Sequence, residues 1–449
     1  MISVQNLPLR LSGNKWLVLC LFFLFVGFPA CTPHKKTHKS STVNTNKPTP
    51  KPPPTIKPEK PTTVNTTPPV KDIKPLPKES TQPKPTKSTF NISFLLPFYA
   101  NYNNLSYGND SIYGKSLLAI SFYQGAEMAL EELQRKGMRF NINLYDTENN
   151  SSRISQLLSE ANVAQSDMLI GPLYSKNIPS VASYCQSRNI YLVSPLSSKI
   201  NGIYDNPYFI NASPSTSSHY EKIVHFLQKN YGCQKFLLIA GNNTKDMQTA
   251  DEIINITFTN PAGERQTPIR ADRITYVSQS QSEIASYLDP ANTNYIVVAS
   301  YDEVVINDLL RKLAILSSDY DIVLVGMPTW DQIESINLDY LEMLKFHMTS
   351  SYFVNSDNML QKQFAENYKN KFGDYPDEYA CKAYDIVRYC VGELKNGMQL
   401  YNTMPSSGTF SKFDIQPSKR TLNQSKADYF ENKAVYMLKY TDFDFVPID

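Results

Sequence analysis

The sequence is poor in the residues that mark catalytic and metal sites. Its 449 residues include only five histidines and two tryptophans. No His-Glu-x-x-His zinc motif and no Gly-x-Ser-x-Gly nucleophile motif occurs in it. The Gly-Lys-Ser at 114–116 lacks the glycine that a phosphate loop needs five residues earlier, since position 109 is Asn109. We therefore expect a protein that is not an enzyme and that uses no metal or other cofactor.

Cysteine is scarce too, and its spacing gives no metal-binding motif. Of the six cysteines, Cys185, Cys233, Cys381 and Cys390 lie beyond the N-terminal region. Cys381 and Cys390 fall on one predicted helix, where their nine-residue spacing corresponds to about 13.5 Å. This is too far for a disulfide bond. Pairing stays open in an oxidising compartment, but we expect free, buried thiols.

The first segment, residues 1–30, predicts a secretory signal peptide. Two positive residues, Arg10 and Lys15, precede an apolar run at 16–28, and the small Ala30 ends the segment. A run of about 13 residues is shorter than the roughly 20 that span a membrane comfortably. An uncleaved N-terminal anchor is the alternative.

The four residues at 28–31, Phe-Pro-Ala-Cys, resemble the lipobox of bacterial lipoproteins. This resemblance implies cleavage before Cys31 and attachment of lipid to it. The acyl chains would then anchor the protein to the membrane without spanning it. Thr32 follows rather than an aspartate, which by resemblance to the lipoprotein sorting rule implies the outer membrane, facing the periplasm.

Residues 31–89 predict a disordered tether. From Thr32 to Thr89 there are 14 prolines and 12 lysines, with few apolar residues. Such a segment cannot bury enough surface to offset its ordering entropy, and it favours extended polyproline-II structure. At about 3.1 Å per residue its full reach is roughly 180 Å.

Charge differs sharply between this tether and the rest of the chain. The signal segment carries +2 and the tether +9, so the overall charge of +2 leaves −9 for residues 90–449. A folded nucleic-acid binder needs a basic face. We therefore expect no nucleic-acid partner.

From residue 90 onward, short apolar runs alternate with helical patterns. The predicted strands are at 90–98, 139–147, 167–172 and 190–195, and then at 235–241, 273–278, 294–301 and 321–328. The predicted helices between them are at 116–137, 151–165, 175–189, 244–258 and 302–316. This alternation predicts parallel βαβ units. Two such arrays in series predict an α/β fold of two doubly wound parallel-sheet lobes, followed by two helices within 358–397 and a hairpin at 433–447.

Several segments share their order and spacing with one known family. Among them are ISFLLPF, YQGAEMALEEL, LYDTENNSS, LIGPLYS, IYLVSPLSS and FGDYPDEYACKAYDIVRY. On these, residues 90–449 resemble the type I periplasmic binding proteins, in the leucine/isoleucine/valine-binding and receptor ligand-binding branch. The resemblance implies a first lobe of about 90–212 plus part of 355–449, and a second lobe of about 213–354. Three crossovers would join them around a ligand cleft.

The resemblance also implies binding residues at the ends of strands. Ser175 falls on the family's ligand-binding serine. Leu196, through its backbone, and Ser198 fall on the positions that hold a ligand carboxylate, with Ser197 between them, and Tyr301 matches an aromatic residue of the second lobe. Ligands do sit beyond the carboxyl ends of parallel strands, where helix N-termini offer N–H groups. The alternative is that Ser175 and Ser197 only cap helices.

The second lobe departs from the amino-acid-binding members. Those members use a tyrosine and a glutamate near the ligand's ammonium group, and the matching places here, 243–245 and 328–329, offer neither. The sequence offers Asp302 or Trp330 as a candidate substitute for these two residues. We expect a small ligand such as an amino acid, peptide or related metabolite, bound by a transport component that serves a permease, or by a sensor.

A second branch of the same fold fits these departures. The C-terminal domain of outer-membrane penicillin-binding protein activators resembles it, which implies a regulator that contacts a cell-wall synthase. The helical-repeat domain of that family has no counterpart here, and the tether stands in its place. Regulation of peptidoglycan synthesis is therefore the alternative function.

Overall fold

The computed structural model describes residues 87–103, 112–231, 235–256, 270–399, 405–421 and 424–448. The chain divides into two units, Met1–Lys84 and Pro85–Asp449, and every described residue belongs to the second. The predicted signal peptide, Cys31, nearly all of the predicted tether and Cys233 lie outside the described residues. Within the described part, no helix is long and apolar enough to cross a membrane.

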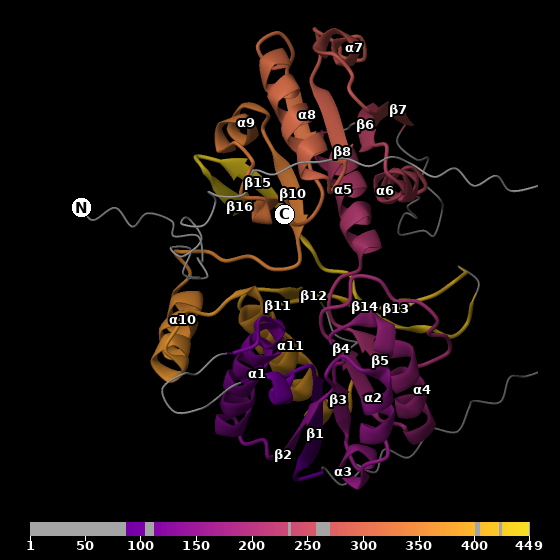
Figure 1. The fold of residues 1–449 in the computed structure, drawn as a ribbon, viewed down its shortest axis with the longest axis vertical. Helices are drawn as coiled ribbons and strands as arrows, with labels where there is room; N and C mark the ends of the chain where they lie inside the picture. Colours follow the sequence, from indigo (N-terminus) through magenta and orange to yellow (C-terminus); the bar gives the residue numbers. More distant parts are fainter. Residues whose placement is uncertain are drawn as a thin grey trace, which may run out of the picture. The chain divides into compact units, whose positions relative to one another are not determined.

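The first of two large sheets has seven strands in the order β13-β14-β5-β4-β3-β1-β2 (Figure 1). Its strands are β1 (Phe90–Leu96), β2 (Phe140–Asp146), β3 (Met168–Ile170), β4 (Tyr191–Ser194), β5 (Phe209–Asn211), β13 (Ile415–Ser418) and β14 (Tyr429–Asn432). All neighbours run parallel except β13 and β14. This order is that of a doubly wound sheet.

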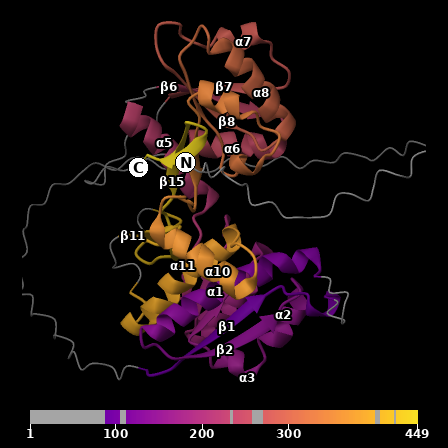
Figure 2. The same ribbon diagram turned by 90° about the vertical axis from the view of Figure 1, so that its left-hand side faces the viewer.

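Helices cover both faces of the first sheet. They are α1 (Leu117–Arg135), α2 (Ser151–Leu157), α3 (Ala161–Ala164), α4 (Ile178–Arg188) and α11 (Glu378–Gly392), while α10 (Met359–Phe372) packs on α11 in a separate cluster. One apolar cluster joins one sheet face to α1 and α11, and another joins the opposite face to α2, α3 and α4. Figures 1 and 2 both show α1 beside α11. The first lobe is therefore a three-layer sandwich.

The second sheet has seven strands in the order β16-β15-β10-β9-β8-β6-β7. Its strands are β6 (Lys235–Gly241), β7 (Arg270–Tyr276), β8 (Asn294–Ala299), β9 (Ile322–Val325), β10 (His347–Ser350), β15 (Tyr436–Thr441) and β16 (Asp444–Pro447). The helices that belong with it are α5 (Thr216–Tyr231), α6 (Thr244–Ile254), α7 (Gln281–Ala285), α8 (Glu303–Leu316) and α9 (Leu338–Met343). The strands β15 and β16 are antiparallel, and they join the parallel part through β10.

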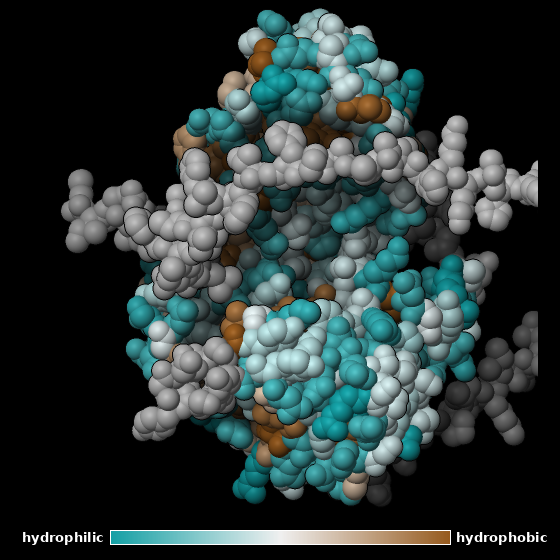
Figure 3. Space-filling view, in the orientation of Figure 1, coloured by the Kyte–Doolittle hydropathy of each residue, from teal (hydrophilic) through white to brown (hydrophobic). Residues whose placement is uncertain are grey.

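Shorter elements complete the described residues. They are the 3-10 turns η1 (Ala100–Tyr102), η2 (Gly114–Ser116), η3 (Ser175–Asn177), η4 (Trp330–Gln332) and η5 (Glu393–Asn396), and the paired strands β11 (Ser406–Ser407) and β12 (Lys412–Phe413). On the face in Figure 3, hydrophilic residues cover most of the described surface and apolar ones form scattered patches.

The local sequence explains these elements. The four residues of β9 are all apolar and all buried, as expected for a central parallel strand. Along α8, Ile306, Leu309, Leu310 and Leu313 recur at helical spacing and are buried in the core of the second sheet. Asp302 caps this helix through the N–H groups of its first turn.

The chain passes between the two sheets at three places within the described residues. These are 212–215, between β5 and α5; 351–358, between β10 and α10; and 433–435, between β14 and β15. The part of 355–449 that joins the first sheet comprises β13 and β14. The strands β15 and β16 join the second sheet instead, in the antiparallel hairpin that the sequence predicts.

Two expectations about secondary structure need correction. The helix predicted at 151–165 is broken into α2 and α3. Leu157 and Val163 are both buried in the same cluster, and in an unbroken helix with about 3.6 residues per turn they would not share a face. Four strands of the two large sheets, β5, β10, β13 and β14, were not predicted, because β5 is three residues long and the other three carry polar residues.

The described cysteines are free thiols, as expected. Cys185, Cys381 and Cys390 are buried and unpaired, and the last two lie on α11. Burial raises the pKa of the Cys185 and Cys390 thiols to about 12, so they stay protonated. Among the described residues, no group of three histidine, cysteine, aspartate or glutamate side chains is placed to hold a metal ion.

Candidate functional site

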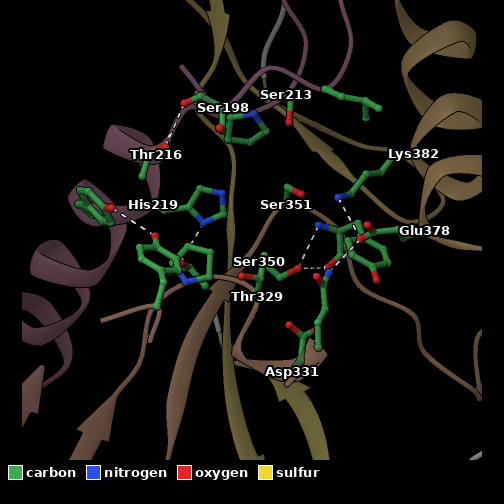
Figure 4. Close-up of a pocket in the computed structure, with 18 of the residues that line it drawn as sticks. Ser198, Ser213, Thr216, His219, Thr329, Asp331, Ser350, Ser351, Glu378 and Lys382 are labelled. Atoms are coloured by element: carbon green, nitrogen blue, oxygen red, sulfur yellow. Dashed lines mark hydrogen bonds and ion pairs between the residues drawn. The ribbon is translucent and has the colours of Figure 1, made fainter. Parts of the chain in front are cut away.

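A pocket of about 360 Å³ is lined by segments that follow strands of both sheets (Figure 4). Most of its lining side chains are polar. They are Ser198, Ser213, Thr216, His219, Tyr220, Lys245, Tyr301, Thr329, Asp331, Gln332, Thr349, Ser350, Ser351, Tyr352, Glu378 and Lys382, with Leu196, Pro214 and Pro328 as the apolar members. The carboxyl ends of parallel strands are where α/β sheets usually bind ligands.

One wall of the pocket comes from the ends of β4 and β5 and from the start of α5. Ser198 lies in the loop after β4, and Ser213 in the loop after β5. Thr216, the first residue of α5, donates from its N–H and its hydroxyl to the carbonyl oxygen of Ser198, at 2.9 and 3.1 Å. This wall therefore combines hydroxyl groups with the N-terminus of a 16-residue helix, the end that carries the positive pole of the helix dipole.

A second wall comes from the second sheet. Tyr301 follows β8, and its hydroxyl lies 3.3 Å from that of Tyr220 on α5. The ammonium group of Lys245 lies over the Tyr301 ring, 3.9 Å from its centroid. Burial, and then the neighbouring Tyr220, raises the pKa of Tyr301 far above its ordinary range. Tyr301 is therefore a neutral phenol at any physiological pH.

A buried carboxylate holds this second wall in place. Asp246, on α6, accepts from the Ser300 hydroxyl at 2.5 Å and from the Tyr301 N–H at 3.2 Å. It also accepts from Asn243 Nδ2 at 2.9 Å. Gly241 leaves room for it, because a Cβ atom there would lie 2.3 Å from Asp246 Oδ2. The backbone position of Tyr301 thus depends on the carboxylate of Asp246.

His219 is buried in the pocket wall in its neutral form. Its Nδ1 lies 2.9 Å from the hydroxyl of Thr349 on β10. Burial, and then the positive charge of Lys382, lowers its pKa to about 3. The ring therefore offers hydrogen bonds without charge at neutral pH.

The remaining side of the pocket carries most of its charge (Figure 4). Glu378 begins α11, and its Oε2 lies 3.4 Å from Lys382 Nζ and accepts from Gln332 Nε2 at 3.3 Å. Lys382 also lies over the ring of Tyr352, 4.6 Å from its centroid. Burial, and then the nearby Glu378, raises the pKa of Asp331. Two carboxyl groups and one ammonium group thus face the same space.

The structure brings three of the five predicted ligand residues together. Leu196, Ser198 and Tyr301 line the pocket. Ser197 is buried and donates to the carbonyl oxygen of Lys199 at 3.4 Å, outside the lining. Ser175 is exposed at the start of η3, also outside the lining. Their contacts with a ligand stay predictions.

The structure does not place Ser175 as a helix cap, and it does not place Asp302 or Trp330 in the pocket. The helices that follow Ser175, η3 and α4, have no side-chain cap, so Ser175 does not act as a cap there. Asp302 caps α8, and Trp330 is buried, stacked on Phe346 with centroids 5.5 Å apart. Neither Asp302 nor Trp330 lines the pocket.

Sequence reasoning missed the charged side of the pocket. It looked for an acidic residue in the second lobe at 328–329, whereas Asp331 lies just beyond and Glu378 comes from α11 of the first lobe. The available signal was Asp377 and Glu378 directly after Pro376, a pattern typical of a helix start. Carboxylates at a helix start more often cap it, as Asp377 does, so the pattern alone does not indicate a binding site.

Solved structures with this fold include substrate-binding proteins of ABC transporters and the C-domain of a regulator of PBP1A. A Rhodospirillum rubrum protein, provisionally described as a branched-chain amino acid ABC transporter, has a TM-score of 0.56 at 11% identity, over 80% of this chain and 100% of that chain. A Desulfitobacterium hafniense ABC transporter substrate-binding protein in complex with Leu has a TM-score of 0.50 at 16% identity, with the same coverage. The C-domain of Haemophilus influenzae LpoA, a regulator of PBP1A, has a TM-score of 0.51 at 12% identity, again over 80% and 100%. At these identities the likeness shows the fold alone.

Comparison of the sequence with known families gives one family match. No curated protein matches this chain. A family model described as periplasmic binding protein matches residues 112–396, which is well over half of the chain and includes the segments that form the pocket walls. The two sheets, with their mostly parallel strands and covering helices, agree with that match. The chain therefore belongs to the periplasmic binding protein family.

Proposed function

We propose that this protein is a non-enzymatic binding protein that closes its two lobes on a small, polar ligand in the pocket. The observation that carries this proposal is the pocket itself, which draws hydrogen-bonding groups from both sheets. Its volume of about 360 Å³ falls within the roughly 300–1,000 Å³ of typical ligand sites. An amino acid, a short peptide or a related metabolite fits a pocket of this size.

The pocket offers different chemistry at its two sides. Ser198, Ser213 and the N-terminus of α5 suit a carboxylate or another oxygen-rich group. Asp331 and Glu378 suit an ammonium group. A ligand that carries both kinds of group would replace solvent on both sides at once. This favours a zwitterion, with Asp331 and Glu378 in the place of the glutamate that the sequence appeared to lack.

Native mass spectrometry of the full-length protein in a mild detergent is the first test. We expect a retained small molecule, or a thermal shift with free amino acids or short peptides. A ligand at a hundred times its dissociation constant stabilises the folded state by about 2.7 kcal/mol, which is easily measured. No retained mass, together with no shift for any amino acid, peptide or muropeptide, overturns the proposal.

Paired variants locate the ligand. Glu378→Gln should weaken binding of an amine-bearing ligand by about tenfold or more, because it removes the charge that faces the ammonium group. Glu366→Gln, on the exposed side of α10, makes the same chemical change outside the pocket and should leave binding unchanged. Equal effects of the two variants contradict the pocket as the site.

A second candidate function is regulation of peptidoglycan synthesis through protein contact. The likeness to the LpoA C-domain favours it. A predicted tether of roughly 180 Å would let the folded part reach a partner across the periplasm. Co-purification with a peptidoglycan synthase, together with a faster polymerising rate, supports this role. Co-purification with a permease supports transport instead.

We also propose that lipid on Cys31 anchors the protein in the outer membrane, facing the periplasm. The lipobox-like Phe-Pro-Ala-Cys at 28–31 supports the anchor, and Thr32 supports the membrane assignment. Palmitate labelling should disappear in Cys31→Ser. Labelling that survives this change overturns the anchor, and recovery in the inner-membrane fraction overturns the location.

A further inference from the structure

One ion pair of α11 lies inside the pocket rather than on an exposed helix face. Lys382 Nζ lies 3.4 Å from Glu378 Oε2, and both residues line the pocket. Pairs at this i, i+4 spacing are common on exposed helix surfaces, where they contribute little. Here, however, the side chains of Lys382 and Glu378 are only 17% and 20% exposed. The pair is therefore largely removed from bulk water and faces the space that a ligand would fill.

Both members of this pair keep hydrogen-bonding capacity for a ligand. Lys382 carries three N–H donors, and its one hydrogen-bond acceptor among the described residues is Glu378. Glu378 accepts from Lys382 and from Gln332 Nε2, in both cases through Oε2. A carboxylate has about four acceptor positions, so Glu378 can accept from a ligand as well. The pair thus presents a donor and an acceptor side by side.

The surroundings of the pair are polar too. In Figure 4, the side chains of Ser213, Ser351 and Lys382 point into the same space. In the part of the chain that the structure describes, neither of these serine hydroxyls has a hydrogen-bond partner. A ligand that fills this side of the pocket displaces water from these groups, and each group that it leaves unpaired weakens its binding.

An aliphatic ligand side chain does not suit this side of the pocket. The methyl groups of leucine, isoleucine or valine would cover Lys382 and Glu378 without forming a hydrogen bond to either. A site built to hydrogen-bond its ligand rejects an analogue that lacks the polar group much more strongly than an apolar pocket rejects a missing methylene group. The pair therefore disfavours branched-chain amino acids.

A charged ligand side chain does not suit the pair either. A second ammonium group on the ligand would meet the like charge of Lys382, and a second carboxylate would meet that of Glu378. Because Lys382 Nζ and Glu378 Oε2 are only 3.4 Å apart, a ligand charge cannot approach one of them without the other. A neutral group that both donates and accepts avoids this repulsion and satisfies both partners.

We propose that the pocket selects an amino acid whose side chain ends in a primary carboxamide, as in asparagine or glutamine. The amide oxygen accepts from Lys382, and the NH₂ group donates to Glu378. A primary carboxamide presents its N–H and C=O on one edge, whereas a trans peptide group presents them on opposite edges. The donor and acceptor of the pair thus match a side-chain amide better than a peptide bond.

The rest of such a ligand uses the other walls of the pocket. Its α-carboxylate is left for Ser198 and the N-terminus of α5, and its α-ammonium group for Asp331, with Glu378 at hand for both N–H-bearing groups. The carboxamide assignment rests on the proposed function, because it names the ligand class of the same pocket.

Ligands of matched shape test this selectivity on the full-length protein in a mild detergent. Leucine, asparagine and aspartate have side chains of the same branched shape, and glutamine and glutamate form a second matched pair. Isothermal titration calorimetry gives the dissociation constant of each. We expect asparagine or glutamine to bind at least about tenfold more tightly than its own acid and than leucine, as for hydrogen bonds to charged groups.

Lys382→Met removes the donor and keeps an unbranched apolar side chain in its place. It should weaken binding of the amide by about tenfold and bring the affinities for asparagine and leucine closer together. A purely structural role of Lys382 would weaken all ligands alike and leave the ratio of these affinities unchanged. Lys395→Met makes the same change at an exposed residue of η5, outside the pocket, and should leave every dissociation constant unchanged.

The possible results separate the carboxamide assignment from the proposed function. Equal affinities for the amide, its acid and leucine overturn the assignment, and so does a Lys382→Met protein that keeps its preference for the amide. Binding of leucine or of a peptide in place of both amides also overturns it, but leaves the pocket as a ligand site. If no amino acid or peptide binds, the proposed function fails as well. If Lys382→Met does not fold, the ligand series on the unaltered protein decides the question by itself.

Discussion

Replacing Gly241 with alanine tests the buried carboxylate behind the second wall of the pocket. A Cβ atom at Gly241 would lie 2.3 Å from Asp246 Oδ2. That oxygen already accepts from Ser300 Oγ at 2.5 Å and from Asn243 Nδ2 at 2.9 Å, so it cannot retreat without breaking these bonds. We expect Gly241→Ala to lower the free energy of unfolding by about 1–3 kcal/mol, the usual cost of overpacking.

The same carboxylate provides a second perturbation. Asp246→Ala leaves the buried Ser300 hydroxyl and the Tyr301 N–H without their acceptor. A buried donor that loses its acceptor costs about 1–3 kcal/mol, so the two donors together should cost about 2–6 kcal/mol. In the double variant, however, the alanine methyl at 241 meets no carboxylate. The cost of Gly241→Ala should therefore fall to a few tenths of a kcal/mol, which gives a coupling of at least about 1 kcal/mol.

Equilibrium urea denaturation of the four proteins measures this coupling. Gly114→Ala is the matched control, because a Cβ atom there meets nothing within 4 Å. The expected order is a mild effect at 114, a clear loss at 241 and a larger loss at 246. Additive costs of the two pocket substitutions, to within about 0.5 kcal/mol, would refute the reasoning. So would a Gly241→Ala protein as stable as the Gly114→Ala control.

Three further predictions concern pH and packing. Burial lowers the pKa of His219 to about 3, so the unfolded chain binds a proton that the folded chain excludes. Between pH 7 and pH 5 this should cost about 2 kcal/mol, and His219→Gln should flatten that part of the stability curve in urea titrations. Asp385 is buried and accepts the N–H groups of residues 409–411, at 2.5 to 2.8 Å. Each of these buried donors costs about 1–3 kcal/mol when it loses its acceptor, so Asp385→Ala should lower the free energy of unfolding by at least about 3 kcal/mol, and a loss below about 1 kcal/mol would contradict this role. At Gly125, a Cβ atom would lie 2.1 Å from the carbonyl oxygen of Ala380, so Gly125→Ala must push α1 and α11 apart. We expect a fall of several degrees in the melting temperature, and an unchanged value would show that the two helices separate freely.

Much of the fold follows from local patterns. The run Ile322–Val325 has no polar residue, and such a run in a chain of alternating helices predicts a central parallel strand. The helices at 358–397 and the hairpin at 433–447 also follow from spacing and turn residues. The strands β5 and β14 do not. They are short, and they pair with each other only because the chain has already crossed to the second sheet and back.

The pocket was predictable only in part. Leu196, Ser198 and Tyr301 line it, because each follows a strand whose end the sequence marks. Glu378 could not be placed from the sequence, since it reaches the pocket through the packing of α11 on α1, two helices far apart in the chain. Local sequence patterns do not indicate which distant helices pack against each other.

The sequence by itself determined the alternation of strands and helices, the division of charge between tether and folded part, and the family resemblance. These features depend on residue types and on their order along the chain, so they can be inferred from the sequence. Only the tertiary structure decided which side chains share a space. In the structure, Ser175 lies outside the pocket, beyond the carboxyl end of β3. Asp331 and Glu378 line the pocket and come from different lobes. Burial and opposed charge arise from packing, and packing joins residues that the sequence keeps apart.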